Sequence, residues 1–534
     1  MKHLLLFILL LNYNIKIQAQ SFQYINDKSF GTTFGESQAF ATRLGNKNII
    51  AGYSSCSGIE FDKTSSNCSA ISPDIWVVAF DDSLNIIWDK TFGGASDDRP
   101  YGITTFNNKI LISGYTRSDT SCSVQLSPKG SFDYWVLIID SLGNKFNEWR
   151  FGSSGSDQNC KIKPTLDGGY ILMGASNGPA DFDKSQACFG IYDYWVVKLD
   201  SSGNKQWDKI FGGNNIEVYT TWDSFNITCL SDSGYLIYGS TSSAFSGNVS
   251  GIPYGSSDAW IIKTNELGQI KWNKRIGGIS SENISDIIEL NNSYLIVGST
   301  RSDSGGTINN IGFGNSDIWL MKSDTSGNII WEQKYGTSYD DYGIKISKTQ
   351  FGNYNILGEV TTTGNGSFSS PSYGMTDYLV MIVDSSGNFL NYIILGSDSL
   401  DFPSSLIDLN DSTYLVCGSA YHGTTPVKHD IGKGGSDYWV VKIGYSTTTG
   451  LTDFGQNLQL HLQPNPAHDY VEITGLPSDD YEVNIYSIEG RLLASKKQHA
   501  DLSLTIPVSH FQSGMYLTKI RNDKLRTTVR WVKE

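Results

Sequence analysis

The sequence predicts an all-β protein in which a seven-bladed β-propeller is followed by a small immunoglobulin-like β-sandwich. Three observations lead to this expectation. Short runs rich in Val, Ile, Tyr and Trp alternate with turns rich in Gly and Asn along most of the chain. A signature, Asp-x-Trp-Val-Val-Lys-x-Asp-x-x-Gly-Asn, recurs about every 60 residues. No long run has the apolar stripe of an amphipathic helix.

The first 19 residues predict a secretory signal peptide. Lys2 and His3 form a short basic start, residues 4–11 are an apolar run, and Ile17-Gln18-Ala19 offers a cleavage site. The apolar run is too short to span a bilayer, and no later segment is apolar enough to do so. We therefore expect an exported protein without a transmembrane segment.

The charge of the chain argues against nucleic-acid binding. The formal net charge is −14, and residues 457–534 hold nine basic and nine acidic side chains, so the acidic excess lies in the preceding part. An acidic surface repels nucleic acid and anionic lipid. We expect neither as a partner.

Seven cysteines are present, and export permits disulfides. Cys56 and Cys68 flank a short polar segment and are the expected pair. Cys122 and Cys188 lie in equivalent loops of neighbouring repeats and offer a second pair. The pairing of Cys160, Cys229 and Cys417 stays open, and the chain has no CxxC motif that would favour a zinc or redox site.

Each repeat resolves into four strand candidates, which is the pattern of a propeller blade. The signature begins at Asp74, Asp133, Asp193, Asp258, Asp317, Asp377 and Asp437. The seventh copy stops after Ile443 and lacks its fourth strand. Residues 23–31 resemble the fourth strands of other copies, so we expect the N-terminal strand to complete the last blade and hide the open edges. The predicted propeller spans residues 20–443.

A carboxylate follows the Gly that closes each repeat, and it starts the strand expected to be innermost. The candidates are Glu36, Asp98, Asp157, Asp223, Glu282, Asp341 and Asp401. In the fourth repeat Glu217 has the usual offset of five residues from that Gly. We prefer Asp223, because it keeps the usual distance to Gly239; a six-residue insertion then includes Trp222, a candidate ligand-binding residue.

Innermost strands of a ring face one channel, so these carboxylates are expected to surround its mouth. Convergent carboxylates repel each other, and Ca²⁺, which prefers oxygen ligands, would relieve the repulsion. No other cofactor is expected. The alternative is that each carboxylate caps its own turn.

No catalytic residue is predicted. The repeats contain two histidines, His422 and His429, in one loop without a nucleophile motif beside them. We expect a non-catalytic binding or adhesion module for an extracellular ligand, either a glycan or a protein. The alternative is a carbohydrate-active enzyme with paired carboxylates at one mouth, which should break the repeat with unique polar residues there.

The repeat signature vanishes after a polar linker at residues 444–456. Residues 457–534 resemble the type A C-terminal sorting domain of type IX secretion cargo. The matching blocks are Gln463-Pro464-Asn465-Pro466-Ala467, then residues 486–493, then Ser513-Gly514-Met515-Tyr516-Leu517 and a basic tail through Lys533. The resemblance implies handling by the type IX machinery, removal of this domain, and release or attachment to the outer surface. The repeats resemble uncharacterised propeller repeats found ahead of such domains.

Overall fold

The computed structural model describes residues 20–218, 225–350, 352–361, 364–410, 412–421 and 423–447, and in the C-terminal part residues 461–463, 467–474, 481–487, 491–498, 503–521 and 526–533. The predicted signal peptide at 1–19 and most of the predicted linker lie outside these ranges. The described residues form strands, turns and loops and contain no helix, which confirms the all-β prediction. No described helix could therefore cross a membrane.

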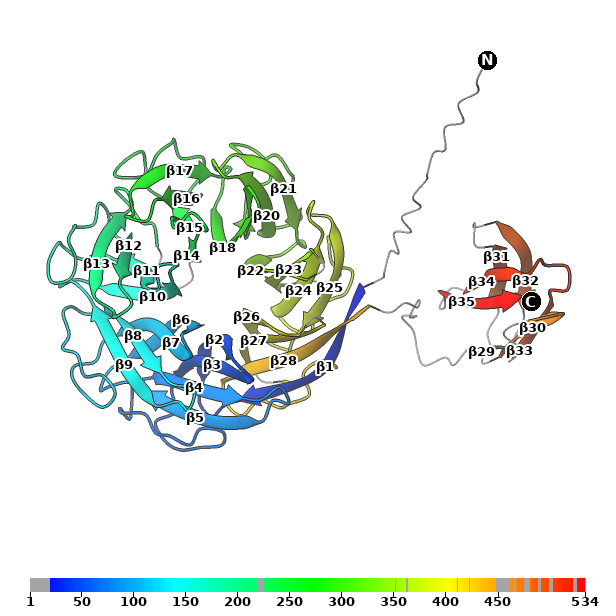
Figure 1. Cartoon of the computed structure of the whole chain (residues 1–534), viewed down its shortest axis with the longest axis horizontal. Coiled ribbons are helices and arrows are strands. Elements are labelled where there is room, and N and C mark those ends of the chain that lie inside the picture. Colours follow the sequence, from blue (N-terminus) through cyan, green and yellow to red (C-terminus); the bar gives the residue numbers. More distant parts are fainter. Residues whose placement is uncertain are drawn as a thin grey trace, which may run out of the picture. The chain divides into compact units, whose positions relative to one another are not determined.

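Seven four-stranded sheets follow one another around a ring within the compact unit Phe22–Tyr445, with β1 beginning at Gln20 (Figure 1). We number them sheets 1 to 7 and give their strands from the centre of the ring outward. Sheet 1 consists of β2 (Glu36–Leu44), β3 (Lys47–Ser54), β4 (Asp74–Phe80) and β5 (Ile86–Phe92); sheet 2 of β6 (Asp98–Phe106), β7 (Lys109–Thr116), β8 (Asp133–Ile139) and β9 (Lys145–Phe151); sheet 3 of β10 (Asp157–Pro164), β11 (Tyr170–Ser176), β12 (Asp193–Leu199) and β13 (Lys205–Phe211); sheet 4 of β14 (Asn226–Cys229), β15 (Tyr235–Thr241), β16 (Asp258–Thr264) and β17 (Ile270–Ile276).

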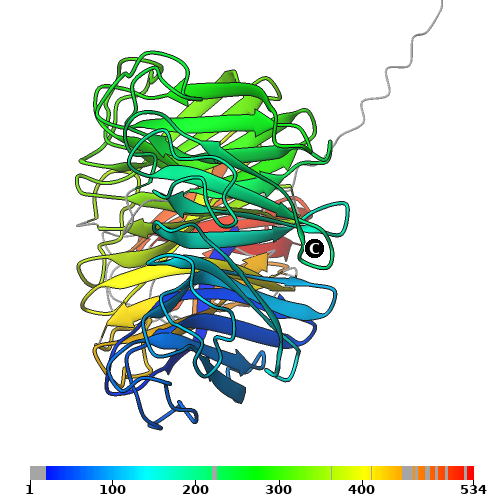
Figure 2. The same ribbon diagram turned by 90° about the vertical axis from the view of Figure 1, so that its left-hand side faces the viewer.

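The remaining three sheets continue the same order. Sheet 5 consists of β18 (Glu282–Leu290), β19 (Ser293–Thr300), β20 (Asp317–Asp324) and β21 (Ile329–Tyr335); sheet 6 of β22 (Tyr342–Lys348), β23 (Tyr354–Val360), β24 (Asp377–Val383) and β25 (Phe389–Leu395); sheet 7 of β26 (Asp401–Asn410), β27 (Thr413–Tyr421), β28 (Ser436–Thr447) and β1 (Gln20–Phe30). Seen from the side, loops project from both ends of the sheets (Figure 2).

The hydrophobic core lies between neighbouring sheets. The third strands of sheets 1 to 4 and 6 are buried at all seven residues, because both faces are covered by the adjacent sheets. One apolar cluster joins Ile171 and Val196 of sheet 3 to Ile237 and Trp260 of sheet 4. Side chains with high β-propensity therefore fill every described interface of this kind.

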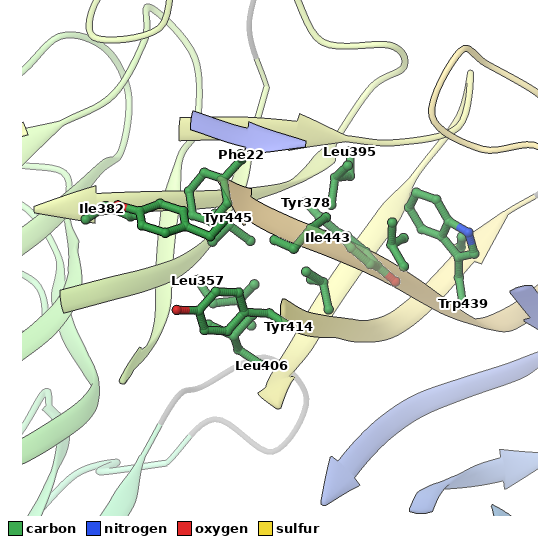
Figure 3. Close-up of a cluster of buried hydrophobic side chains, with 14 residues drawn as sticks. Phe22, Leu357, Tyr378, Ile382, Leu395, Leu406, Tyr414, Trp439, Ile443 and Tyr445 are labelled. Atoms are coloured by element: carbon green, nitrogen blue, oxygen red, sulfur yellow. The ribbon is translucent and has the colours of Figure 1, made fainter. Parts of the chain in front are cut away.

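The chain closes the ring with its own N-terminal strand. β1 lies beside β28 in sheet 7, as expected from the sequence. Trp439 Nε1 donates a hydrogen bond to Asp27 Oδ2 at 2.9 Å, and the Phe22 and Tyr445 rings meet edge to face at 5.2 Å. Figure 3 shows Phe22, Tyr445 and Trp439 packed with Tyr378 and Leu395 of sheet 6. This contact removes the open edge at which the ring would otherwise end.

The C-terminal unit has two sheets that share one core. The first is β29 (His461–Gln463), β30 (Tyr470–Thr474) and β33 (Ser503–Pro507); the second is β32 (Leu492–Gln498), β31 (Tyr481–Ser487), β34 (Gly514–Arg521) and β35 (Arg526–Lys533). Val471 and Leu504 of the first sheet pack with Ile485 and Ile520 of the second. Two layers around one core agree with a sandwich; the immunoglobulin-like topology stays a prediction.

Candidate functional site

Each sheet of the ring opens with a buried carboxylate. We call these seven side chains the opening carboxylates, and the end of the sheets where they lie the opening end. Each accepts a hydrogen bond from the backbone N–H four residues earlier, at 2.6–3.1 Å, in the turn that leaves the previous sheet. They are Glu36, Asp98, Asp157, Glu217, Glu282, Asp341 and Asp401.

The opening carboxylates do not converge at a mouth, contrary to our expectation. All seven are at most 2% exposed. Most also accept a bond from a hydroxyl at the end of the second strand or in the loop after it, as Glu36 does from Ser54 Oγ at 2.7 Å and Glu282 from Ser302 Oγ at 2.6 Å. Each carboxylate therefore caps its own turn, because that turn presents N–H groups that no strand partner satisfies.

In sheet 4 the structure decides between Glu217 and Asp223 as the opening carboxylate, and our preference for Asp223 was wrong. Glu217 accepts Gly213 N at 3.1 Å and Thr241 Oγ1 at 2.8 Å, as the other opening carboxylates do in their sheets. Glu217, not Asp223, is therefore the equivalent residue, because the extra residues of this repeat follow it instead of preceding it. Asp223 and the predicted ligand-binding residue Trp222 lie outside the described residues.

The predicted Ca²⁺ site gains no support from this arrangement. Among the described residues, no three His, Cys, Asp or Glu side chains are grouped so that they could hold a metal ion. The Ca²⁺ site stays a prediction, which chelation followed by the melting temperature would test. Burial raises the pKa of Glu36, Asp341 and Asp401 to about 7, so proton binding offers these carboxyl groups another way to lose their charge.

The aspartate that begins each signature lies against the Gly that closes the same sheet. A Cβ on Gly212 would lie 2.2 Å from Asp193 Oδ1 and 2.8 Å from Glu217 Oε2. Glycine is therefore the only residue that fits between the two carboxyl groups. Burial and the neighbouring Glu217 raise the pKa of Asp193 to about 8. The signature aspartate, the closing Gly and the opening carboxylate of the next sheet therefore form one structural unit where the chain passes from one sheet to the next.

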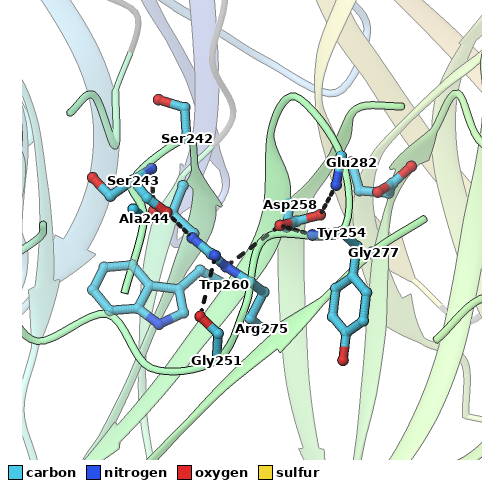
Figure 4. Close-up of polar contacts among 12 residues, drawn as sticks. Ser242, Ser243, Ala244, Gly251, Tyr254, Asp258, Trp260, Arg275, Gly277 and Glu282 are labelled. Carbon is cyan, nitrogen blue, oxygen red and sulfur yellow. Dashed lines mark hydrogen bonds and ion pairs between the residues drawn. The ribbon is translucent and has the colours of Figure 1, made fainter. Parts of the chain in front are cut away.

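In most sheets a buried lysine or arginine side chain lies beside the signature aspartate or in the loop next to it. The sequence analysis did not predict these cations. In sheets 2, 4 and 5 the cation stands two residues before the closing Gly, as Arg150, Arg275 and Lys334. Arg150 Nε pairs with Asp133 Oδ2 at 2.6 Å, and both side chains are at most 1% exposed. Figure 4 shows Arg275 between Asp258 and the carbonyl groups of Ser243 and Gly251.

In sheets 1, 3 and 7 the cation comes instead from the loop after the second strand. Lys63, Lys184 and Lys428 are at most 3% exposed and donate to carbonyl groups of their own loops. The strand position then holds Thr91, Ile210 or Ser29. Sheet 6 has neither cation, because Phe368 and Ile394 occupy the two positions. This alternation was visible in the sequence as a lysine or arginine at one of two places in every repeat except the sixth.

Unique polar side chains gather at the opening end of sheets 1 and 2. We call Tyr53, Asp97, Arg99, Tyr101 and Tyr115 the tyrosine–arginine cluster. The Arg99 guanidinium lies 4.4 Å from the centre of the Tyr53 ring, and its Nε donates to Asp97 Oδ1 at 2.8 Å. Tyr115 OH donates to Asp97 Oδ2 at 3.1 Å, and the Tyr101 and Tyr115 rings are 6.0 Å apart.

The tyrosine–arginine cluster is partly open to solvent. The Arg99 side chain is 30% exposed and the Asp97 side chain 18% exposed, and Tyr53 and Tyr101 are half-buried. The position of Arg99 is filled in the other sheets by Ser37, Gln158, Val218, Asn283, Tyr342 and Phe402. Two sheets therefore break the repeat at one end, which the uniform spacing of the sequence concealed.

A second, acidic group lies at the same end between sheets 5 and 6. Arg301 Nη2 approaches Asp340 Oδ1 at 3.4 Å and Tyr342 OH at 3.1 Å. Burial, with the nearby charges of Asp341 and Asp340, raises the pKa of Glu359 to about 7. Glu359 therefore keeps its proton to a higher pH than an ordinary carboxyl group does.

The one described histidine of the ring has a simple structural contact. His429 is 60% exposed at its side chain, and its Nδ1 lies 2.7 Å from Tyr24 OH. His422 lies outside the described residues. No nucleophile accompanies His429 among its described contacts.

The expected Cys56–Cys68 disulfide is wrong. Cys68 pairs with Cys122, with a Cα–Cα distance of 6.2 Å, so the bond joins the loops of sheets 1 and 2. Cys56 is buried at the start of its loop, with Sγ 3.6 Å from Gly58 O. Cys188 is free, so its suggested bond to Cys122 is also absent. Loops of neighbouring sheets run side by side, and this brings together cysteines that are distant in sequence.

Comparison with known proteins identifies the C-terminal unit. Residues 461–534 match the family model of the secretion system C-terminal sorting domain. This segment is a type IX secretion sorting domain. It is the part that the type IX machinery handles, and it places the protein outside the cell, either secreted or attached to the outer surface. No curated protein matches the chain.

Solved structures resemble the chain at low identity. Puromycin hydrolase has a TM-score of 0.42 and 9% identity, covering 83% of this chain and 59% of that one. BBS1N, solved in complex with ARL6DN, has a TM-score of 0.41 and 8% identity, covering 78% and 96%. Phage phi92 endosialidase has a TM-score of 0.39 and 10% identity, covering 96% and 87%. We draw no functional conclusion from these similarities.

Proposed function

We propose that residues 20–447 form a seven-bladed β-propeller that acts outside the cell as a non-catalytic binding module, with a glycan as its ligand. The ring of seven four-stranded sheets supports the architecture, and the sorting domain supports display or release. The tyrosine–arginine cluster is the observation that carries the binding site. It brings three tyrosine rings and a planar cation together at one end of two neighbouring sheets, whereas the group at Arg301 has one tyrosine contact.

The chemistry of the cluster suits a sugar. Half-exposed rings such as those of Tyr53 and Tyr101 offer flat apolar surface, and their hydroxyl groups offer hydrogen bonds. Arg99 is held in place by Asp97 and by the Tyr53 ring, so little side-chain entropy is lost when a ligand binds. The sorting domain directs export, so this surface would be available to a glycan outside the cell.

A glycan-array screen of the purified protein tests the proposal. Arg99→Ala should weaken binding to any glycan found by about tenfold or more, because it removes a charged anchor. Arg301→Ala is the matched control, since Arg301 also contacts an aspartate and a tyrosine at the opening end. Binding that survives Arg99→Ala but is lost with Arg301→Ala would move the site to sheets 5 and 6.

Glu359 favours a second candidate, a carbohydrate-active enzyme. A glycosidase needs one carboxyl group that is protonated and another that is ionised. Glu359, with its pKa near 7, and Asp340, which pairs with Arg301, would fill these roles. Hydrolysis of a polysaccharide by the purified protein, abolished by Glu359→Gln, would replace the binding proposal with this one.

A further inference from the structure

A second arginine extends the tyrosine–arginine cluster along sheet 2. Arg117 directly follows β7, and its guanidinium carbon lies 4.8 Å from the centre of the Phe132 ring. Phe132 meets Tyr115 edge to face, with ring centres 5.0 Å apart, and Arg117 N donates to Asp97 O at 3.1 Å. Arg117 is exposed and Phe132 is half-buried. A continuous set of contacts therefore joins the Arg117 guanidinium to the proposed binding surface.

Arg117 has no acidic partner, in contrast to its counterpart in sheet 5. Arg117 and Arg301 each directly follow the second strand of their sheet, and Arg301 reaches Asp340 at 3.4 Å. The position of Asp340, just before the opening carboxylate, is held in sheet 2 by Asp97. Both side-chain oxygens of Asp97 already accept hydrogen bonds inside the cluster, at 2.8 and 3.1 Å. Among the described residues, no ion pair includes Arg117, so its guanidinium contacts an aromatic ring instead of a carboxylate.

This contact leaves the hydrogen-bonding capacity of Arg117 to solvent or to a ligand. An aromatic ring attracts the charge of a guanidinium but does not satisfy its five N–H donors. A carboxylate accepts two of these donors side by side, and such a paired, charged contact is stronger than neutral hydrogen bonds. The Phe132 ring also holds the arginine in place, so less side-chain entropy is lost on binding. The free donors of Arg117 therefore suit a sugar that carries a carboxylate.

We propose that the glycan bound at the tyrosine–arginine cluster is acidic, and that Arg117 binds the carboxylate of one of its uronic acid residues. This inference rests on the proposed glycan binding and names the class of its ligand. Arg99 stays bonded to Asp97 and orders the tyrosine rings, while Arg117 supplies the charge that recognises the ligand. The acidic excess of the chain before residue 457 disfavours a densely charged polymer, so the ligand carries isolated carboxylates instead of one on every sugar.

A glycan array tests the inference when it holds uronic-acid-containing oligosaccharides, each beside its carboxyl-reduced form. Reduction turns the carboxylate into an alcohol and leaves the rest of the sugar unchanged. The acidic member of a pair should bind the purified protein about tenfold more tightly or better, because a charged hydrogen-bonded pair is lost on reduction. Binding of neutral glycans alone would overturn the inference and leave the proposed function standing. Absence of binding to any glycan would overturn both.

Variants of Arg117 assign the carboxylate to this residue. Arg117→Gln should weaken binding of the acidic form about tenfold and leave binding of the reduced form unchanged. Arg117→Lys keeps the charge but not the paired donors, and its affinity should lie between the two. Arg301→Gln, the matched substitution in sheet 5, should change neither affinity. Arg117 is exposed, so its variants should keep the melting temperature of the unaltered protein. An unchanged affinity of Arg117→Gln for the acidic form, or an equal loss for both forms, overturns the assignment.

Discussion

Sheets 2 and 6 hold the loop after their second strand in different ways: sheet 2 uses buried charged groups, and sheet 6 uses mostly aromatic packing. In sheet 2, Trp135 Nε1 donates to Glu148 Oε2 at 2.8 Å, and Gln125 N donates to the other oxygen of Glu148 at 2.7 Å. Arg150 then bonds Asp133 and the Ser118 carbonyl group. The interior of this sheet is a continuous polar network that fixes the loop after the second strand.

Sheet 6 keeps the signature aspartate, Asp377, and replaces the other side chains of that network. Leu379 stands for the tryptophan, Tyr392 for the glutamate and Ile394 for the arginine. Tyr392 OH still accepts a loop N–H, that of Ser370, at 3.0 Å. Its ring packs 5.3 Å from that of Phe368, which occupies the position of the loop cation. The loop is held by aromatic packing and one hydroxyl group instead of by charges.

The comparison separates what the repeat requires from what it can exchange. Both sheets keep the signature aspartate, the closing Gly and the opening carboxylate, because these bond backbone groups that every sheet exposes. The tryptophan, the acid and the cation can be exchanged: sheet 6 lacks all three, and sheet 4 has Asn273 in place of the acid, where Trp260 Nε1 donates to Asn273 Oδ1 at 3.3 Å. A buried polar group that loses its partner is costly, so a repeat that changes one member of such a network tends to change the others.

The largest effect should follow removal of the buried cation in sheet 2. Arg150→Met leaves Asp133 without its partner and should cost about 3–5 kcal/mol in the free energy of unfolding. Chemical denaturation would measure this. The matched control is Ile394→Met in sheet 6, where no cation is present at this position and the cost should stay below about 1.5 kcal/mol.

A second substitution sharpens this prediction. The pair Val124→Lys with Arg150→Ile copies sheet 3, in which Lys184 and Ile210 occupy these positions. If the cation can come from either place, the double variant should be more stable than Arg150→Met. A double variant no more stable than the single one would show that the two positions are not exchangeable.

A smaller effect is expected for the tryptophan of sheet 2. Trp135→Leu should cost about 2–3 kcal/mol, through lost packing and through an unsatisfied oxygen on Glu148. Adding Glu148→Tyr copies Leu379 and Tyr392 of sheet 6 and should recover about 1 kcal/mol. A double-mutant cycle measures this coupling. Additive losses would mean that tryptophan and acid vary independently.

The regular strands and ring closure could be predicted because they depend on local alternation and on a repeat with constant spacing. The missing strand after Ile443 and its match at residues 23–31 together specified the closure. Burial was harder to infer. Asp98 and Asp401 looked like channel-mouth acids, because a sequence does not show whether a turn presents free N–H groups.

Contacts between neighbouring sheets account for the other errors and omissions. Cys68 meets Cys122, and Tyr53 meets Arg99, because adjacent sheets align residues that are 46 or more positions apart. No local pattern reports such pairs. The buried cations did leave a signal, namely the alternation between Arg150 in one repeat and Lys184 in the next.

The smallest effect concerns pH and again separates the two sheets. Sheet 6 has no buried cation beside Asp377, and burial raises the pKa of Asp377 to about 6 and that of Asp401 to about 7. In the unfolded chain such groups titrate near pH 4. Between about pH 4 and 7 the folded protein therefore holds protons that the unfolded chain has released. Rising pH must lower the free energy of unfolding over this range.

From the titration of Asp377 and Asp401 alone, we expect a melting temperature about 2 °C lower at pH 8 than at pH 5. Asp377→Asn with Asp401→Asn should flatten that part of the dependence, because an amide does not titrate. Asp384→Asn, in the exposed hairpin turn of the same sheet, is the matched control and should leave the slope between pH 5 and 8 unchanged. An unchanged slope in the double variant would mean that both carboxyl groups are ionised in the folded protein. Sheet 6 would then tolerate a buried charge on Asp377 without a cation of its own, which the contrast with sheet 2 argues against.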